Sequence, residues 1–177
     1  MPLFRLIPFA SDPLVSGLSL TGSVELAGSA LRARYVLAGD LSAVVIPGPA
    51  SAPERRDGLW RNTCFEIFCA PQQQARYLEV NASPSGDWNA YSFTSYREGM
   101  APLSVAHFSS QCTRLNATEL ALHFELQLLA DHAPGPHCAL GVTAVIEHSD
   151  GTRSYWALKH TGERPDFHRR DSFILPL

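Results

Sequence analysis

The chain has 177 residues, of which 45% are hydrophobic and 18% are charged, as in an ordinary soluble globular protein. Its formal net charge is −3 and it has no basic run, so we expect no nucleic-acid partner. The first 25 residues contain one cation, Arg5, and their apolar stretches are interrupted by prolines, which argues against a signal peptide. No apolar run reaches membrane-spanning length. We therefore expect one cytoplasmic domain over residues 1–177 with no membrane partner.

Short runs with strand-like alternation follow one another along the chain. They lie at residues 3–9, 20–27, 30–38, 42–47, 62–70, 75–83, 87–97, 103–114, 118–129, 138–148, 152–160 and 171–176. In the clearest run, 118–129, leucines and a phenylalanine alternate with mostly polar residues, which is typical of an antiparallel strand with one solvated face. No window has a helical period. The pattern predicts an all-β fold, an antiparallel β-sandwich of about ten strands, jelly-roll-like with immunoglobulin-like layering.

The segment from Gly58 to Cys69 is the most informative of these runs, because its alternation separates two kinds of residue. One face is apolar and consists of Phe65, Ile67 and Cys69. The other face consists of Trp60, Asn62 and Glu66. A strand that buries one face and gathers a tryptophan, an amide and a carboxylate on the other is suited to holding a ligand.

The turn Pro71–Gln74 predicts a hairpin between residues 62–70 and 75–83. With a four-residue loop, Glu66 lies opposite Glu79, and Asn81 lies nearby on the same face. Two carboxylates directly opposite each other destabilise a sheet unless a cation, a metal ion or a shared proton compensates them. We expect a cation such as Arg97, or a polar ligand, between the two carboxylates.

The sequence Asp150-Gly151 predicts a second hairpin, with a two-residue turn of type I′. This turn places Val145 opposite Trp156 and turns Trp156 away from the core. Exposed aromatic rings stack on the apolar faces of sugars, while carboxylates and amides bond the hydroxyls. Trp156 is therefore a candidate platform for a ligand.

Several segments of the chain resemble one group of proteins. LWRNTCFEIF at 59–68 and YLEVNASPSGDW at 77–88 resemble the family 9 carbohydrate-binding modules, and more closely the bacterial DOMON-like proteins grouped with them. Residues 91–100, 146–160 and 165–173 resemble signature blocks of the DOMON-like group. The resemblance covers residues 55–177. It implies a β-sandwich in which the sugar-binding members hold a sugar between two tryptophans, supported by acidic, amide and arginine side chains.

The resemblance carries four residues over by position. Trp60 matches the first tryptophan platform, Glu66 the carboxylate that follows it, and Asn81 an amide on the next strand. Trp156 matches the second platform. The resemblance thus implies non-catalytic binding of a small sugar, a glycan or a similar polyol.

The chain departs from the family pattern at Glu79, where the sugar binders carry an arginine two residues before the amide. Either Arg97 or Arg61 takes over the role of that cation, or the ligand differs. Tyr91 is a weaker candidate platform. The predicted ligand-binding residues are Trp60, Glu66, Glu79, Asn81, Tyr91, Arg97 and Trp156.

Other readings involve a cofactor or a metal ion, although the sequence predicts neither. A haem-binding electron carrier of DOMON type would use Met100 together with His160 or Lys159 as axial ligands. A structural cation such as calcium also stays open. A zinc site would draw on residues that fall within a short C-terminal stretch, namely His148, His160, Asp166 and His168.

A further alternative is a glycan-acting enzyme, because two carboxyl groups are enough for glycoside hydrolysis. The candidates for such a pair are Asp87, Glu98, Glu147 and Asp166. No nucleophile elbow or phosphate-binding loop accompanies them. We therefore expect a binding protein rather than an enzyme, and the sequence leaves its oligomeric state open.

Overall fold

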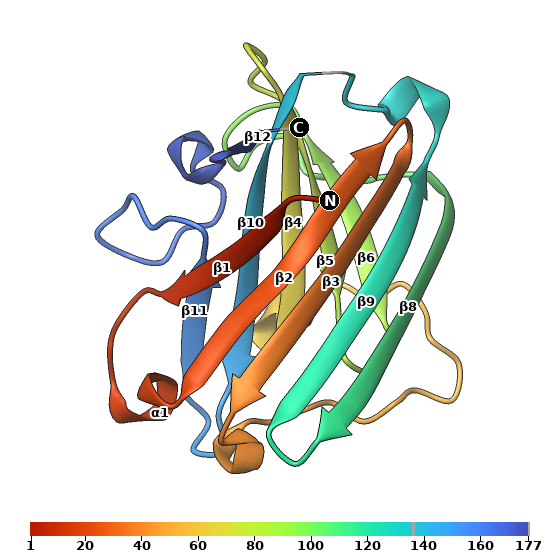
Figure 1. Ribbon diagram of the computed structural model, residues 1–177. Helices are drawn as coiled ribbons and strands as arrows, with labels where there is room; N and C mark the ends of the chain where they lie inside the picture. The colour runs from red at the N-terminus through yellow and green to blue at the C-terminus, as the bar shows by residue number, and fades with distance from the viewer. Residues whose placement is uncertain (136, 177) are drawn as a thin grey trace.

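A computed structural model describes residues 1–135 and 137–176 of the chain (Figure 1). The N-terminal half contains β1 (Leu3–Pro8), α1 (Pro13–Ser16), β2 (Leu18–Ala27), β3 (Ala30–Gly39), η1 (Leu41–Ala43), η2 (Leu59–Arg61), β4 (Cys64–Pro71) and β5 (Tyr77–Ala82). The C-terminal half contains β6 (Trp88–Phe93), β7 (Ala101–Pro102), β8 (Val105–Asn116), β9 (Glu119–Leu128), η3 (Ala130–His132), β10 (Cys138–Glu147), β11 (Arg153–Ala157), η4 (Arg170–Ser172) and β12 (Leu175–Pro176). None of the helices in this part of the chain has the length and hydropathy that a bilayer crossing requires.

The strands form two layers that face each other (Figure 1). One layer has the order β1-β2-β3-β9-β8, the other β7-β6-β5-β4-β10-β11, and pairing of β1 with β11 joins them at one edge. All pairs between named strands are antiparallel. The expected all-β antiparallel sandwich is confirmed; the described residues form twelve strands, where about ten were expected, and the short β12 pairs with β10.

The main core fills the space between the layers. Strand β9 directs Leu120, Leu122, Phe124, Leu126 and Leu128 into it, as its alternation predicts. Strand β4 contributes Phe65, Ile67 and Cys69, so the apolar face expected for this strand is confirmed.

The other face of β4 is buried too, because the chain after β11 folds over it. Phe68 and Ala70 pack there in a second apolar cluster with Tyr77, Phe93 and Phe173. The C-terminal segment contributes Phe173 to this cluster, and Phe167 packs against it. This outer face of the β4 layer carries the candidate site.

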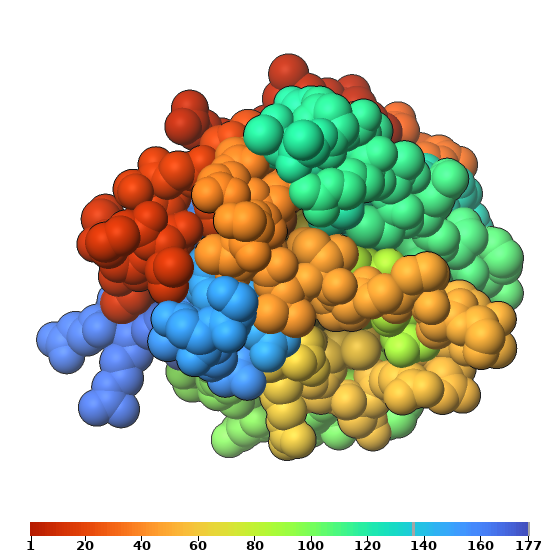
Figure 2. All heavy atoms as spheres, turned by 90° about the horizontal axis from the view of Figure 1, so that it is seen from below, coloured from red at the N-terminus to blue at the C-terminus, as the bar shows by residue number. Residues whose placement is uncertain are grey.

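One predicted strand, 42–47, is wrong. Asp40 accepts a hydrogen bond from the amide of Ser42 at 3.0 Å and so begins the 3-10 helix η1. Only an isolated bridge between Val44 and His148 follows it. The chain from about residue 40 to residue 60, drawn in orange to yellow, then crosses one end of the sandwich (Figure 2).

This crossing segment also changes the position of Trp60. Gly58 takes a left-handed conformation with φ of 76° and starts the 3-10 helix η2, which contains Trp60. Strand β4 begins only at Cys64. We expected Trp60 to lie on the same strand as Glu66. Instead, Trp60 approaches the same face of the sheet from a separate short helix.

The register of β4 and β5 differs from the prediction by two residues. Glu66 pairs with Asn81, and Phe68 pairs with Glu79, whereas the expected pair was Glu66 with Glu79. A shift of two residues leaves every side chain on its expected face. Glu66 and Glu79 are therefore diagonal neighbours rather than directly opposed.

The register of β10 and β11 differs by one residue. Residues 149–151 form a three-residue loop in which Gly151 has φ of 84°, and the amide of His148 bonds the carbonyl of Thr152. Trp156 therefore pairs with Ala144, and Tyr155 pairs with Val145. A shift of one residue exchanges the faces, so Trp156 points into the main core and Tyr155 points out of it.

Candidate functional site

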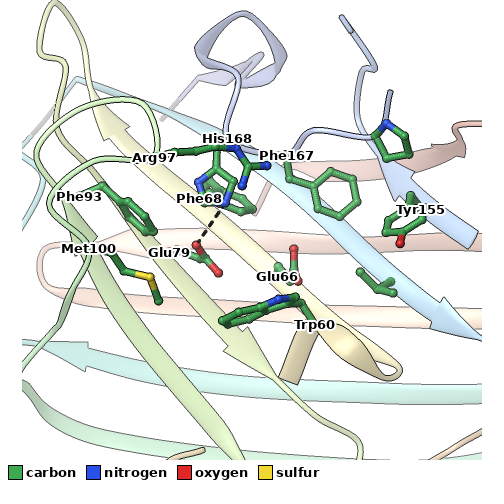
Figure 3. Close-up of a pocket in the computed structure, with 12 residues that line it drawn as sticks. Trp60, Glu66, Phe68, Glu79, Phe93, Arg97, Met100, Tyr155, Phe167 and His168 are labelled. Carbon is green, nitrogen blue, oxygen red and sulfur yellow. Dashed lines mark ion pairs between the residues drawn. The ribbon is translucent and has the colours of Figure 1, made fainter. Parts of the chain in front are cut away.

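A cavity of about 300 Å³ lies on the outer face of β4, β5, β10 and β11, beneath the loops that follow β6 and β11 (Figure 3). Its floor is acidic and its walls are mostly aromatic. The residues that line it are Trp60, Glu66, Phe68, Glu79, Phe93, Arg97, Met100, Val145, Tyr155, Pro165, Phe167 and His168.

Glu66 and Glu79 form the acidic floor. Their side chains belong to adjacent strands, and the two residues are only 2% and 4% exposed. The Oε2 atom of Glu66 accepts a hydrogen bond from Thr143 Oγ1 at 2.9 Å, and Oε1 of Glu79 accepts one from Asn81 Nδ2 at 2.6 Å. Within residues 1–135 and 137–176, the remaining oxygen of each carboxyl group accepts no hydrogen bond, and both groups face the cavity.

Burial makes both carboxyl groups weak acids. Loss of hydration, and then the charge of Glu79, raise the pKa of Glu66 to about 8, although the Thr143 hydrogen bond opposes this. Burial also raises the pKa of Glu79 to about 7, against the hydrogen bond from Asn81 and the charge of Arg97. Near neutral pH the pair therefore retains part of its protons, and the two groups titrate together.

The cations around the floor give it little compensation. We expected Arg97 between the two carboxylates. Instead, Arg97 forms an ion pair with Asp166 at 2.8 Å. Nε2 of His168 is 3.9 Å from Glu79 Oε2, a contact drawn as a dashed line in Figure 3. Burial and the charge of Arg97 lower the pKa of His168 to about 4, so this imidazole is neutral near pH 7.

The walls of the cavity present aromatic rings from different elements (Figure 3). Trp60 is 36% exposed, and its ring packs edge-on against Tyr91 with 6.1 Å between the ring centroids. Tyr155 and Phe167 lie on another side of the carboxylates, also 6.1 Å apart. Rings on two sides of a polar floor are the arrangement that holds a flat, partly apolar ligand.

Tyr91 supports this site without being a platform. It is only 2% exposed, and its hydroxyl donates to Asp57 Oδ1 at 2.7 Å and accepts from Asn89 Nδ2 at 2.8 Å. Burial and the Asp57 carboxylate raise the pKa of Tyr91 well above its ordinary value. The expectation that Tyr91 stacks on a ligand is wrong, and its ring instead packs behind Trp60.

The expectation that Trp156 is the second platform is also wrong. Trp156 is 1% exposed within the main core, where its indole Nε1 donates to Ser154 Oγ at 3.0 Å. Its neighbour Tyr155 faces the cavity instead. The alternation of the strand could have identified Tyr155 as the residue that faces the cavity, but only if the length of the preceding turn had been known.

The residues proposed for haem or a metal ion are not brought together. Met100 lies at the cavity rim, whereas Nε2 of His160 is bonded to the carbonyl of Ile7 outside the cavity, so the two do not form an axial pair. His148 is buried and bonded to Ser154. In the described part of the chain, no three His, Cys, Asp or Glu residues lie close enough together to hold a metal ion.

Three other predicted acids lie outside the cavity. Asp87 forms an ion pair with Arg56, Glu98 accepts from Ser95, and Glu147 accepts from Asn62. Asp166 lies at the rim, paired with Arg97.

Arg61 does not supply the missing cation either. It is exposed in η2 and does not line the cavity; its carbonyl accepts a hydrogen bond from Arg153. The carboxyl pair that the structure brings together is therefore Glu66 and Glu79, with Asn81 bonded behind it.

No protein family and no curated protein matches the sequence of this chain. Solved structures do share its fold. A candidate carbohydrate-binding protein from Bacteroides uniformis has a TM-score of 0.69 at 14% identity, and the match covers 99% of this chain and 86% of that one. A family 9 carbohydrate-binding module from Caldicellulosiruptor kristjanssonii, solved with cellotriose, has a TM-score of 0.61 at 11% identity, over 99% and 80%.

A further family 9 module structure from Caldicellulosiruptor kristjanssonii, solved with glucose, has a TM-score of 0.50 at 13% identity, over 89% of this chain and 73% of that one. At such identities, the likeness establishes that the chain has the β-sandwich fold of these modules.

Proposed function

We propose that this protein binds a small carbohydrate or a similar polyol, without catalysis, in the cavity over β4 and β5. The observation that carries the proposal is the combination of an acidic floor with aromatic walls in one cavity of about 300 Å³. Structures with the same fold, solved with cellotriose and with glucose, support a sugar as the class of ligand. A pyranose ring has the shape and the mixed polarity that such a cavity recognises.

Each part of the cavity has a role in this proposal. Trp60 stacks on one apolar face of the sugar, and Tyr155 and Phe167 cover another. The free oxygens of Glu66 and Glu79 accept hydrogen bonds from hydroxyl groups. Asn81 is fully buried and acts as a positioning residue, because its amide fixes the Glu79 carboxylate rather than reaching the ligand.

We also propose that the chain is related to the bacterial DOMON-like proteins. Two of the segments that resemble that group, 91–100 and 165–173, contribute cavity residues in this structure, among them Arg97, Met100 and Phe167. Arg97 and Asp166 tie these two segments together at the rim. This shared contribution supports the relation, and it links the resemblance to the site itself.

The stacking role of Trp60 gives the direct test. We expect Trp60→Ala to weaken binding of glucose or cellotriose about tenfold, because loss of an aromatic contact costs about 1.4 kcal/mol. Isothermal titration calorimetry measures the affinity, and Trp60→Phe should recover part of it. Leu115→Ala, at an exposed site on β8, is the control and should bind like the wild type. Equal affinity of Trp60→Ala and wild type for every sugar that binds would reject the stacking role.

Glycoside cleavage is a second candidate, favoured by the two adjacent carboxyl groups with raised pKa values on the cavity floor. We expect no release of nitrophenol from aryl glycosides above the level of a buffer control. Release that is lost in both Glu66→Gln and Glu79→Gln, but kept in Glu163→Gln at an exposed loop site, would establish the enzyme instead.

A further inference from the structure

We infer that the ligand of this cavity is an amino sugar, whose protonated amine binds between Glu66 and Glu79. This inference rests on the proposed function, since it names the class of sugar that the same site takes. It follows from three features of the cavity: carboxylate oxygens without a protein donor, the lack of a cation between the two carboxyl groups in the described part of the chain, and aromatic rings around the acidic floor.

The oxygens without a protein donor are the first feature. Glu66 and Glu79 are both more than nine-tenths buried, and each uses one oxygen for a hydrogen bond within the protein. In the described residues, the second oxygen of each has no donor and faces the cavity. Neither oxygen is among the fully buried atoms without a partner, so both reach solvent in the cavity, and a ligand that displaces water from them has to supply donors to both. An ammonium group carries three N–H donors and reaches two acceptors at once.

The charge around the floor is the second feature. Arg97 forms its ion pair with Asp166 rather than with either floor carboxyl group, and His168 is neutral near pH 7. Tyr77 donates or accepts at His168 Nδ1 at 2.7 Å, and Tyr91 bonds to Asp57, so neither adds a cation. The floor is therefore net negative whenever either carboxyl group is ionised. A neutral sugar leaves that charge uncompensated, whereas an ammonium group cancels it.

The rings around the floor are the third feature. Trp60, Phe68, Phe93, Tyr155 and Phe167 all line the same cavity as the two carboxyl groups. The negative faces of aromatic rings attract a cation at short range, and a water-poor site strengthens this attraction. The walls therefore favour the same charge as the floor does, while they still accept the apolar face of a pyranose.

A metal ion fits the cavity less well than an ammonium group. Calcium takes six to eight oxygen ligands, and magnesium requires nearly octahedral oxygen coordination. The cavity offers two carboxyl groups and the imidazole of His168, 3.9 Å from Glu79, but within residues 1–135 and 137–176 no three acidic, histidine or cysteine side chains lie close enough together to hold a metal ion. Aromatic walls supply no oxygen ligands, so the remaining positions would stay empty.

The test compares sugars that differ only in the amine. Calorimetry at pH 7 measures binding of glucose, 2-amino-2-deoxyglucose and 6-amino-6-deoxyglucose, together with the N-acetylated form of each amino sugar. We expect at least one amino sugar to bind about 10 to 100 times more tightly than glucose, the range of a charged hydrogen bond in a buried site. Its N-acetylated form should lose this preference, because acetylation removes the charge.

Two variants assign the preference to the floor. Glu79→Gln should lower the ratio of amino-sugar affinity to glucose affinity toward one, and Glu66→Gln should do the same. Glu163→Gln removes an exposed carboxylate outside the cavity and should keep the wild-type ratio. Because the inference concerns a ratio, it does not depend on the absolute affinity of either variant, and the wild-type sugar series tests it without any variant.

The outcomes separate the two proposals. Glucose binding that is as tight as that of both amino sugars would overturn the inference and leave the proposed function standing. Ethanolamine binding as tightly as the amino sugars, with no binding of glucose, would overturn the sugar ligand and keep amine recognition. Absence of binding by all the sugars and by ethanolamine would overturn both.

Discussion

Trp156→Ala is expected to lower the free energy of unfolding by about 3–5 kcal/mol, the usual cost of truncating a large aromatic side chain in a core. Trp156 is 1% exposed in the main core, so its removal leaves a cavity that the neighbouring strands cannot refill. It also leaves the Ser154 hydroxyl without its indole donor. Chemical denaturation monitored by circular dichroism measures the loss.

Trp60→Ala is the matched comparison for this variant. Trp60 is 36% exposed in a 3-10 helix, so its truncation should cost less than about 1 kcal/mol of stability. The two tryptophans thus have opposite roles: one stabilises the fold and the other contacts the ligand. If Trp156→Ala kept wild-type stability and lost sugar binding, the placement of Trp156 in the core would be refuted.

The second large effect is a loss of stability as the pH rises above neutral. Glu66 and Glu79 have folded-state pKa values of about 8 and about 7, above the ordinary value of 4.5. Between the ordinary value and these values, the folded protein holds more protons than the unfolded chain does. Their contribution to stability is therefore complete at low pH and is lost as the pH rises through the folded-state values.

The best window for this measurement is pH 6.5 to 8. Burial lowers the pKa of His168 to about 4 and also lowers that of His160, so both histidines give the opposite slope below pH 6.5. Above it, the wild type should lose about 1–2 kcal/mol of unfolding free energy up to pH 8. Urea denaturation at several pH values measures the slope.

Glu66→Gln isolates the carboxyl pair in this experiment. The amide keeps an acceptor for Thr143 but carries no charge, so we expect a flatter profile and a stability about 2 kcal/mol above the wild type at pH 8. Glu163→Gln, at an exposed site, should follow the wild-type profile. Parallel profiles for Glu66→Gln and the wild type would show that this carboxyl group is not perturbed by burial.

The sequence predicted correctly which side of the sheet each side chain faces wherever the predicted register of a hairpin was wrong by an even number of residues. The register of β4 and β5 is shifted by two, so Glu66 and Glu79 still share a face. The β10–β11 loop has three residues instead of two, and that single residue exchanges Tyr155 and Trp156. Alternation fixes which residues share a face, but the turn decides which face it is.

The walls of the cavity could not be predicted in the same way. Phe167 and His168 lie in a C-terminal segment without strand or helix, which tertiary contacts alone hold over β4. The pairing of Arg97 with Asp166 joins residues 69 positions apart, and no periodicity indicates it. The predicted strand at 42–47 failed for a related reason, since the capping side chain of Asp40 outweighs the apolar run.

The cavity combines a floor made of strands with walls that come partly from loops, and the sequences of the floor and of these loops are free to change at different rates. The strand residues Glu66 and Glu79 are held by hydrogen bonds of the sheet, so changes in their backbone disturb the whole sandwich. The loops that carry Arg97 and Phe167 lie at the surface, where insertions and substitutions cost little. New ligand preferences can therefore evolve by loop exchange on an inherited acidic floor, while the stability of the sandwich is preserved.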